Sequence, residues 1–185
     1  MTAKIILIHP PVAKCPEPPA GIARLSACLT ENGIHHEVID ANLEGLLFLL
    51  KNESKKKTGN DRWTTRARKD LNLNLAALKD PSTYRNQSRY QKAVMDINRL
   101  SNDAGKSMNA ELSLADYQDK TLSPVKSADL FNAAENPRIN PFFPYFQKHL
   151  TDALNQNPGF IGFSVNYLSQ ALCTFAMIGF IKEIH

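Results

Sequence analysis

A chain of 185 residues is long enough for one domain with its own core, and 43% hydrophobic against 22% charged residues is a globular balance. No apolar run approaches the roughly 18 residues that span a membrane, and prolines interrupt the first run too early for a signal peptide. Three well-separated cysteines, Cys15, Cys28 and Cys173, form neither a CxxC pair nor an even disulfide set, so we expect a cytoplasmic protein.

The net charge of +4 is concentrated in one segment. Residues 51–106 hold fourteen Lys and Arg against six Asp and Glu, a local charge of +8, while the rest of the chain is acidic. A basic segment can contact nucleic acid, but no nucleic-acid recognition motif accompanies this one. We therefore interpret the basic segment as a solvated helical surface.

The first forty residues predict a βαβ unit. Lys4 to His9 is a short apolar run that stops at proline, which is typical of a buried parallel strand. Ala20 to Asn32 follows as a helix, with Pro18 and Pro19 at its entrance and an Asn-Gly stop. The stretch HHEVIDAN then predicts a second strand, which a right-handed crossover makes parallel to the first.

Helical spacing dominates the middle of the chain. A short helix is predicted at Leu43 to Leu50, and apolar residues recur every three or four positions in Trp63 to Leu78 and Tyr90 to Leu100. The stretch Asp80 to Thr83 separates the two segments with a proline and a capping hydroxyl. We expect a helical hairpin on the surface of the domain, away from the carboxyl edge of the sheet.

Regular structure returns near the end of the chain. Leu112 to Asn140 is polar and irregular, with one helix that we expect Ser127 to cap. Asn140 itself precedes a proline and a phenylalanine-rich helix. FIGFSVNY, residues 160–167, predicts the third strand, and Leu168 to Ile184 is apolar on almost all sides, as a buried helix is.

These elements predict an α/β fold: a flavodoxin-like (Rossmann-like) parallel sheet formed by residues 1–50 and 140–185, with a helical insertion at about 51–139. One domain then covers residues 1–185. The last helix should pack on strands that this chain lacks, so we expect an N-terminal piece of a longer protein, and a complete small domain is the alternative. An exposed apolar helix face and a free strand edge would favour self-association.

Ligands of open parallel sheets bind beyond the carboxyl ends of the strands. Three loops meet there: the proline-rich loop His9 to Gly21, the segment that starts at Asp40, and Ser164 to Tyr167. The first loop leads into free helix-start amides at Ala20 to Ile22. Asp40 follows Gly21 at about the spacing of a ribose-binding acid, but GxGxxG is missing, which argues against a dinucleotide. Asp40 could instead cap the next helix, and His9 could simply pack on its prolines.

Four stretches together carry a family resemblance. They are a strand that ends in HPP, the helix PPAGIARLSACLTENG, the acid in VIDAN, and IGFSVNY before an apolar helix. Together they resemble the N-terminal cobalamin-binding domain of cobalamin-dependent radical SAM proteins. The resemblance covers Met1 to about Gly45 and Asn140 to His185. It implies a flavodoxin-like sheet, with the corrin across its carboxyl edge and the nucleotide tail beside the third strand.

The resemblance also implies which residues contact the cofactor. The loop from His9 to Gly21 would border the corrin, and the end of the third strand would line the tail pocket. Ser164 would hydrogen-bond a tail or amide group, and Asn166 a corrin amide. The expected cofactor-binding residues are His9, Pro10, Pro11, Cys15, Ala20, Gly21, Asp40, Ser164, Val165, Asn166 and Tyr167.

Two motifs of the wider family are missing. Asp-x-His-x-x-Gly is absent around His9, so we expect no histidine ligand to cobalt, and there is no CxxxCxxC for an iron–sulfur cluster. S-adenosylmethionine and a [4Fe-4S] cluster would then belong to a radical SAM domain further along a full-length chain, and this chain would contribute no catalytic or metal-ligating residue. Two other functions remain open: a non-catalytic interaction domain whose basic hairpin binds an acidic partner, and a nucleotide-binding domain.

Overall fold

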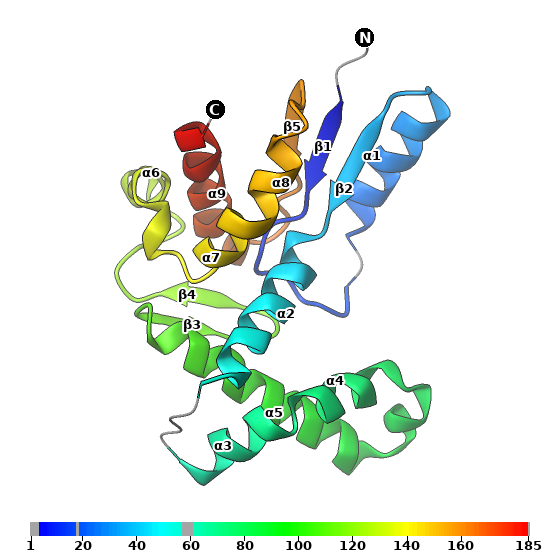
Figure 1. The fold of residues 1–185 in the computed structure, drawn as a ribbon, viewed down its shortest axis with the longest axis vertical. Helices are drawn as coiled ribbons and strands as arrows, with labels where there is room; N and C mark the ends of the chain where they lie inside the picture. The colour runs from blue at the N-terminus through cyan, green and yellow to red at the C-terminus, as the bar shows by residue number, and fades with distance from the viewer. Residues whose placement is uncertain (1–3, 18, 57–60, 185) are drawn as a thin grey trace.

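The computed structural model describes residues 4–17, 19–56 and 61–184. Its centre is a three-stranded parallel sheet in the order β2-β1-β5 (Figure 1), with β1 at Ile5–Ile8, β2 at His36–Ile39 and β5 at Phe160–Phe163. Ile5 lies opposite both His36 and Phe160. The predicted α/β class with a parallel sheet is confirmed.

Helices cover both faces of this sheet (Figure 1). Helix α1 (Ala20–Glu31) packs on the face that carries Leu7, although Ile22 is its only buried residue. Pro18, part of its predicted entrance, lies outside the described residues. The opposite face carries Ile6 and Ile8, which share one core with α7 (Phe143–Tyr145), the π-helical turn η3 (Phe146–Leu150), α8 (Thr151–Leu154) and α9 (Ala171–Ile184).

The largest buried side chains explain why this face is stable. Phe142, Tyr145 and Phe146 are each 0% exposed, and Met177 of α9 is equally buried. Fully burying one such side chain is worth about 1.5–3 kcal/mol. Asn140 precedes this aromatic segment, and its Oδ1 accepts a hydrogen bond from the backbone N–H of Phe142 at 2.9 Å, but Phe142 itself is the N-cap of α7.

Helix α9 is covered by its own chain. Helix α6 (Ser127–Glu135) crosses it so closely that a Cβ on Gly179 would lie 1.8 Å from the carbonyl oxygen of Ala134. The expected exposed apolar face of α9 is therefore wrong, and so is the burial expected of Leu168, which is 56% exposed in the 3-10 turn η4 (Leu168–Gln170). Among the described strands β5 pairs only with β1, so the expected free sheet edge is present.

The insertion is helical at its centre, as predicted. It comprises α3 (Arg62–Lys69), α4 (Leu71–Lys79), the 3-10 turn η1 (Pro81–Arg85) and α5 (Gln87–Lys106), followed by α6. Lys126, not Ser127, is at the N-cap of α6. A short antiparallel hairpin of β3 (Ala110–Leu112) and β4 (Tyr117–Asp119) was not predicted.

The insertion lies beyond the carboxyl ends of the strands (Figure 1), so the prediction that it avoids this edge is wrong. The reason is α2 (Ala41–Ser54), which is longer than predicted and extends away from the sheet. Its Leu46 and Leu50 form a second core with α3 and α5. The insertion also contacts the loop after β1, where the Cys15 N–H donates to the carbonyl of Leu114 at 3.4 Å.

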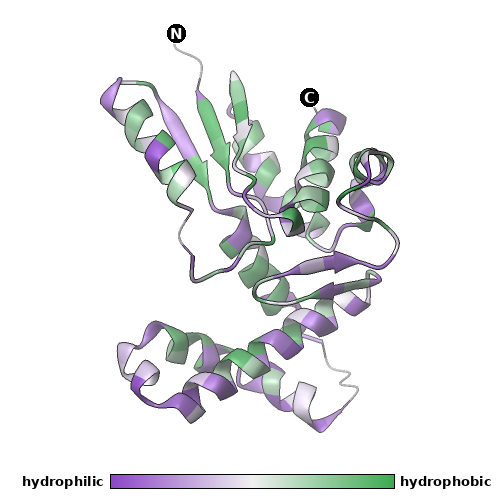
Figure 2. Cartoon of the chain, turned by 180° about the vertical axis from the view of Figure 1, so that it is seen from behind, coloured by the Kyte–Doolittle hydropathy of each residue, from purple (hydrophilic) through white to green (hydrophobic). Residues whose placement is uncertain are grey.

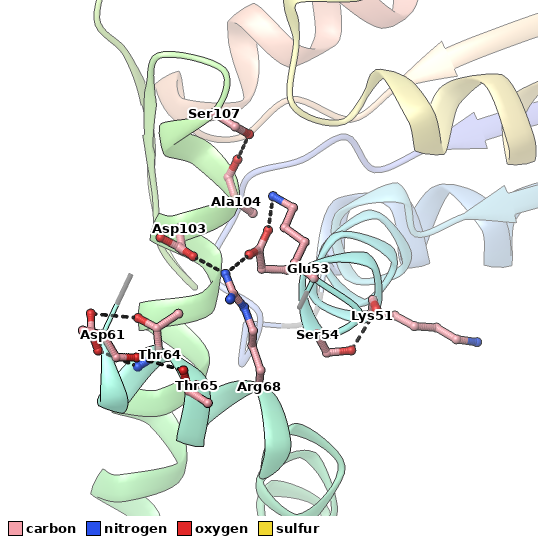
Figure 3. Close-up of polar contacts among 11 residues, drawn as sticks. Lys51, Glu53, Ser54, Asp61, Thr64, Thr65, Arg68, Asp103, Ala104 and Ser107 are labelled. Atoms are coloured by element: carbon pink, nitrogen blue, oxygen red, sulfur yellow. Dashed lines mark hydrogen bonds and ion pairs between the residues drawn. The ribbon is translucent and has the colours of Figure 1, made fainter. Parts of the chain in front are cut away.

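Charge and hydropathy separate the two parts of the chain. Figure 2 shows hydrophobic residues concentrated in the sheet and the helices beside it, whereas the insertion helices are hydrophilic along much of their length. A buried ion cluster ties the parts together (Figure 3): the Arg68 guanidinium of α3 donates to Glu53 of α2 and to Asp103 of α5, both at 2.6 Å. The Glu53 side chain is only 2% exposed, so this cluster needs all its partners.

Candidate functional site at the carboxyl edge

The loop after β1 is held by two buried amide side chains. Asn42, at the start of α2, accepts from the N–H of Ala13 at 2.9 Å and donates to its carbonyl at 3.2 Å. Gln170, from η4, donates to the carbonyl of Pro10 at 2.6 Å. Both amides are at most 4% exposed. The loop is therefore fixed from two sides as well as stiffened by its prolines.

Gln170 also organises the loop after β5. Its Oε1 accepts from the backbone N–H of Asn166 at 2.8 Å and from that of Tyr167 at 3.0 Å. One side chain thus joins the first and third loops at the carboxyl edge, and it sets the space between them.

A cavity of about 260 Å³ occupies that space. The residues around it come from the first loop, the start of α1 and the loop after β5. They are His9, Ala13, Glu17, Pro19, Ala20, Gly21, Asn166 and Tyr167. Five residues expected at the site, from segments far apart in the sequence, therefore meet at one cavity.

A second, more apolar groove of about 180 Å³ runs between α1 and β5. It is lined by Leu7, Gly21, Ile22, Leu25, Gly162, Phe163 and Ser164. Gly21 borders both hollows, and a Cβ at this glycine would lie 3.9 Å from the Ser164 hydroxyl. The two spaces are therefore neighbours that meet at Gly21.

Two kinds of polar group in the residues around the first cavity lack a partner. His9 is 3% exposed, and its Nδ1 has no hydrogen-bond partner among the described residues. An unpaired buried polar atom costs about 1–3 kcal/mol, so a ligand or a water molecule that reached His9 Nδ1 would recover part of that cost. The first turn of α1 has no side-chain cap and no acidic residue, which leaves its backbone N–H groups available.

Three exposed side chains, Lys14, Glu17 and Tyr167, form a hydrogen-bonded cluster beside this cavity. The Tyr167 hydroxyl donates to the carboxylate of Glu17, which also pairs with Lys14 at 3.0 Å. The hydrogen bond from Tyr167 and then that from Lys14 lower the pKa of Glu17, and the same contacts raise the pKa of Tyr167 and Lys14. This cluster combines the charged side chains of Lys14 and Glu17 with the aromatic ring of Tyr167.

The other expected residues lie outside both hollows. Pro10 and Pro11 are buried residues of the first loop, and Val165 is 46% exposed without lining either space. Cys15 packs against the insertion core, where burial raises its pKa to about 11. Asp40 accepts from the N–H of Leu43 at 3.0 Å, so it caps α2, as the alternative interpretation had it.

Several residues of the site were not foreseen. Leu7 and Gly162 both face the groove because they lie opposite each other in the paired strands β1 and β5. Strand alternation could have placed them on one face only if the pairing of these strands had been known. Glu17, Asn42 and Gln170 were missed because each also bonds a residue far away in the sequence, Tyr167, Ala13 and Pro10 respectively.

In residues 4–17, 19–56 and 61–184, no group of three or more His, Cys, Asp or Glu side chains is arranged to hold a metal ion. No helix in the same part of the chain is both long and apolar enough to cross a bilayer.

The chain was compared with known proteins in three ways, and no family model, curated protein or solved structure matches it.

Proposed function

We propose that this chain is a cobalamin-binding module with a flavodoxin-like arrangement of its sheet. The observation that carries the proposal is the pair of adjoining hollows at the carboxyl edge, one polar and one apolar, which meet at Gly21. The family resemblance expects the corrin along the loop from His9 to Gly21 and the nucleotide tail beside the end of the third strand, and the two hollows lie at these elements. Binding beyond the carboxyl ends of parallel strands also agrees with the general rule for such sheets.

The apolar groove fits a flat aromatic base. Leu7, Ile22 and Leu25 supply apolar walls, and Ser164 adds one hydroxyl at the junction with the polar cavity. Each hollow is smaller than the ~300–1,000 Å³ of a site that encloses a whole drug-sized ligand. The groove would thus hold the tail, while the macrocycle would lie outside, against the exposed surface of Asn166 and Tyr167.

The polar cavity fits an amide or phosphate arm of the same cofactor. The unpaired Nδ1 of His9 and the uncapped start of α1 are groups that such an arm would satisfy. His9 is then a hydrogen-bonding residue and not a cobalt ligand. Bound cobalamin would supply methyl-transfer or radical chemistry, and the chain's own residues would hold and orient it.

The proposal extends to the protein's context. In a full-length chain, a radical SAM domain with S-adenosylmethionine and a [4Fe-4S] cluster would act on the cofactor that this module positions, in a methyl transfer or a radical rearrangement. No residue of the present chain is assigned a catalytic role.

Gly21→Leu tests the proposal with little risk to the fold. Nothing lies within 3.9 Å of a new Cβ there, so the longer side chain should enter the hollows instead of clashing. We expect visible-spectrum titration with hydroxocobalamin to show at least tenfold weaker binding. Ala23→Leu, on the exposed surface of the same helix, is the matched control and should bind normally.

Two results would contradict the proposal: folded wild-type chain that does not bind hydroxocobalamin, or equal loss in the two leucine variants. His9→Ala should weaken binding without the spectral change that follows loss of an axial imidazole. If that change is seen, histidine ligates cobalt and the role given to His9 is wrong.

A nucleotide is the second candidate ligand, and one observation favours it. The uncapped start of α1 faces the polar cavity without an acidic residue in its first turn, which suits a phosphate group. Equilibrium dialysis with ATP and NAD distinguishes the two functions. Nucleotide binding that Gly21→Leu abolishes, in a chain that ignores cobalamin, would replace the first proposal.

A further inference from the structure

A second groove lies beside α2, apart from the two hollows at the carboxyl edge. A groove of about 470 Å³ runs between this helix and the segment of α7 and η3, and it shares no residue with the carboxyl-edge hollows. Its lining is Glu44, Leu47, Phe48, Lys51, Asn52, Lys55, Tyr145, Lys148 and His149.

Helical spacing explains how these residues come to face one another. The groove residues of α2 and of its C-cap, Lys55, follow one another at intervals of three, one, three, one and three positions, which is one continuous stripe of a helix. Tyr145, Lys148 and His149 form the matching stripe across the groove. The groove is therefore built from two regular surfaces and not from a loop.

The rim of the groove is positive. Lys51, Lys55 and Lys148 are exposed, and none of them forms an ion pair among the described residues. The neighbouring Lys56, in contrast, is paired with Glu53 at 2.6 Å. Three ammonium groups around one hollow repel each other unless an anion lies between them.

The one carboxylate among the residues that line the groove is hydrogen-bonded to a tyrosine of the opposite wall. Glu44 accepts a hydrogen bond from the Tyr145 hydroxyl at 2.9 Å, and this tyrosine is 0% exposed. The contact and the burial, of which burial is the larger cause, raise the pKa of Tyr145. Glu44 therefore helps to fix the wall of the groove, and three lysines remain against this one carboxylate, an excess of positive charge.

The far wall has an unusual backbone. Residues Phe146–Leu150 form a π-helical turn, and such turns are rare and often found at functional sites. His149 stacks on Tyr145 at 5.0 Å between ring centroids, and the Lys148 ammonium lies 5.9 Å from the ring centroid of Phe48. The turn thus presents a cation and an imidazole side by side above an apolar floor of Leu47 and Phe48.

We propose that this groove binds a small molecule that carries two or three phosphate groups. Several negative charges are needed to match three lysines, and Lys binds phosphate as a point charge without demanding one geometry. The groove is large enough for a drug-sized ligand, and its floor offers apolar surface to the rest of the molecule. This site does not depend on cobalamin binding at the carboxyl edge.

Isothermal titration of the 185-residue chain with inorganic triphosphate tests the proposal. We expect binding that weakens between low and physiological salt, and at least tenfold loss when Lys51, Lys55 and Lys148 are all changed to Gln. The matched control changes three other exposed lysines, Lys79, Lys106 and Lys182, to Gln and should lose less than twofold.

Further controls separate this groove from other anion sites. A loss of triphosphate affinity in Gly21→Leu as large as that in the variant of the three groove lysines would place the anion at the carboxyl edge and overturn the proposal. Absence of triphosphate binding, or equal losses in the two triple variants, would overturn the proposal. So would a single-stranded RNA that binds through the three groove lysines while triphosphate does not, since the partner would then be a nucleic acid.

Discussion

Gln170→Leu removes the side chain that joins two loops of the carboxyl edge while keeping a similar volume. The wild-type amide makes three hydrogen bonds, one to the carbonyl of Pro10 and two from the backbone N–H groups of Asn166 and Tyr167. Leucine can make none of them. Asn166 and Tyr167 are exposed, so water can replace two of the bonds, but the Pro10 carbonyl belongs to a buried residue.

The expected cost follows from that difference. A net hydrogen bond is worth about 0.5–1.5 kcal/mol, and a buried carbonyl left unpaired costs about 1–3 kcal/mol. We therefore expect Gln170→Leu to lower the free energy of unfolding by about 2–4 kcal/mol. With an m-value of about 2 kcal/mol/M in urea, the midpoint of unfolding should fall by about 1–2 M.

Urea unfolding followed by far-UV circular dichroism measures this change. Gln147→Leu is the matched control, because Gln147 is exposed on η3 and should change stability by no more than about 0.5 kcal/mol. A loss for Gln170→Leu no larger than that of the control would refute the reasoning. A second readout is hydroxocobalamin binding below the transition, which should weaken because the two loops are no longer joined.

The other predictions concern the core. Gly179→Ala should lower the free energy of unfolding, measured by heat or urea, by at least about 3 kcal/mol, because the new Cβ would overlap the carbonyl of Ala134. Gly21→Ala meets no atom closer than 3.9 Å and should change this free energy by about 1 kcal/mol or less. Arg68→Met should lower the free energy of unfolding by about 3–5 kcal/mol, since it removes the cation that Glu53 and Asp103 share and leaves the buried Glu53 with only the more exposed Lys56. Burial raises the pKa of Cys173 to about 12, above the ~8.5 of an unfolded thiol, so the folded state keeps a proton that the unfolded state loses. This contribution to stability is complete below about pH 8.5 and should decline as the pH rises from there towards about 12. A Cys173→Ala variant with an equally steep decline would show that another group is responsible.

The sheet was predictable because its signals are local. Short apolar runs that end at proline or at a turn identify β1 and β2, and the helix between them makes the strands parallel. The third strand was predicted over residues 160–167 but ends at Phe163. It stops early because Gln170 takes the next free backbone N–H groups, at Asn166 and Tyr167, away from the sheet.

The insertion was only partly predictable, because its position depends on tertiary packing. The three-residue strands β3 and β4 are too short to show alternation, and they form where Ala110, Leu112 and Tyr117 can be buried in the main core. The prediction that charge would keep the hairpin away from the sheet edge failed, since α2 extends four residues beyond its predicted end and carries the insertion with it.

The proline-rich loop explains why a binding edge can be built here at little cost. Proline has no N–H, so burying Pro10 and Pro11 leaves mainly carbonyl groups to satisfy. Gln170 bonds the carbonyl of Pro10, and Asn42 bonds both backbone groups of Ala13. Ordering a flexible residue on binding would cost about 1–2 kcal/mol, and this loop has already lost that freedom on folding. A ligand at the carboxyl edge would therefore contact a loop that is already ordered, and its binding free energy would not be reduced by the cost of ordering that loop.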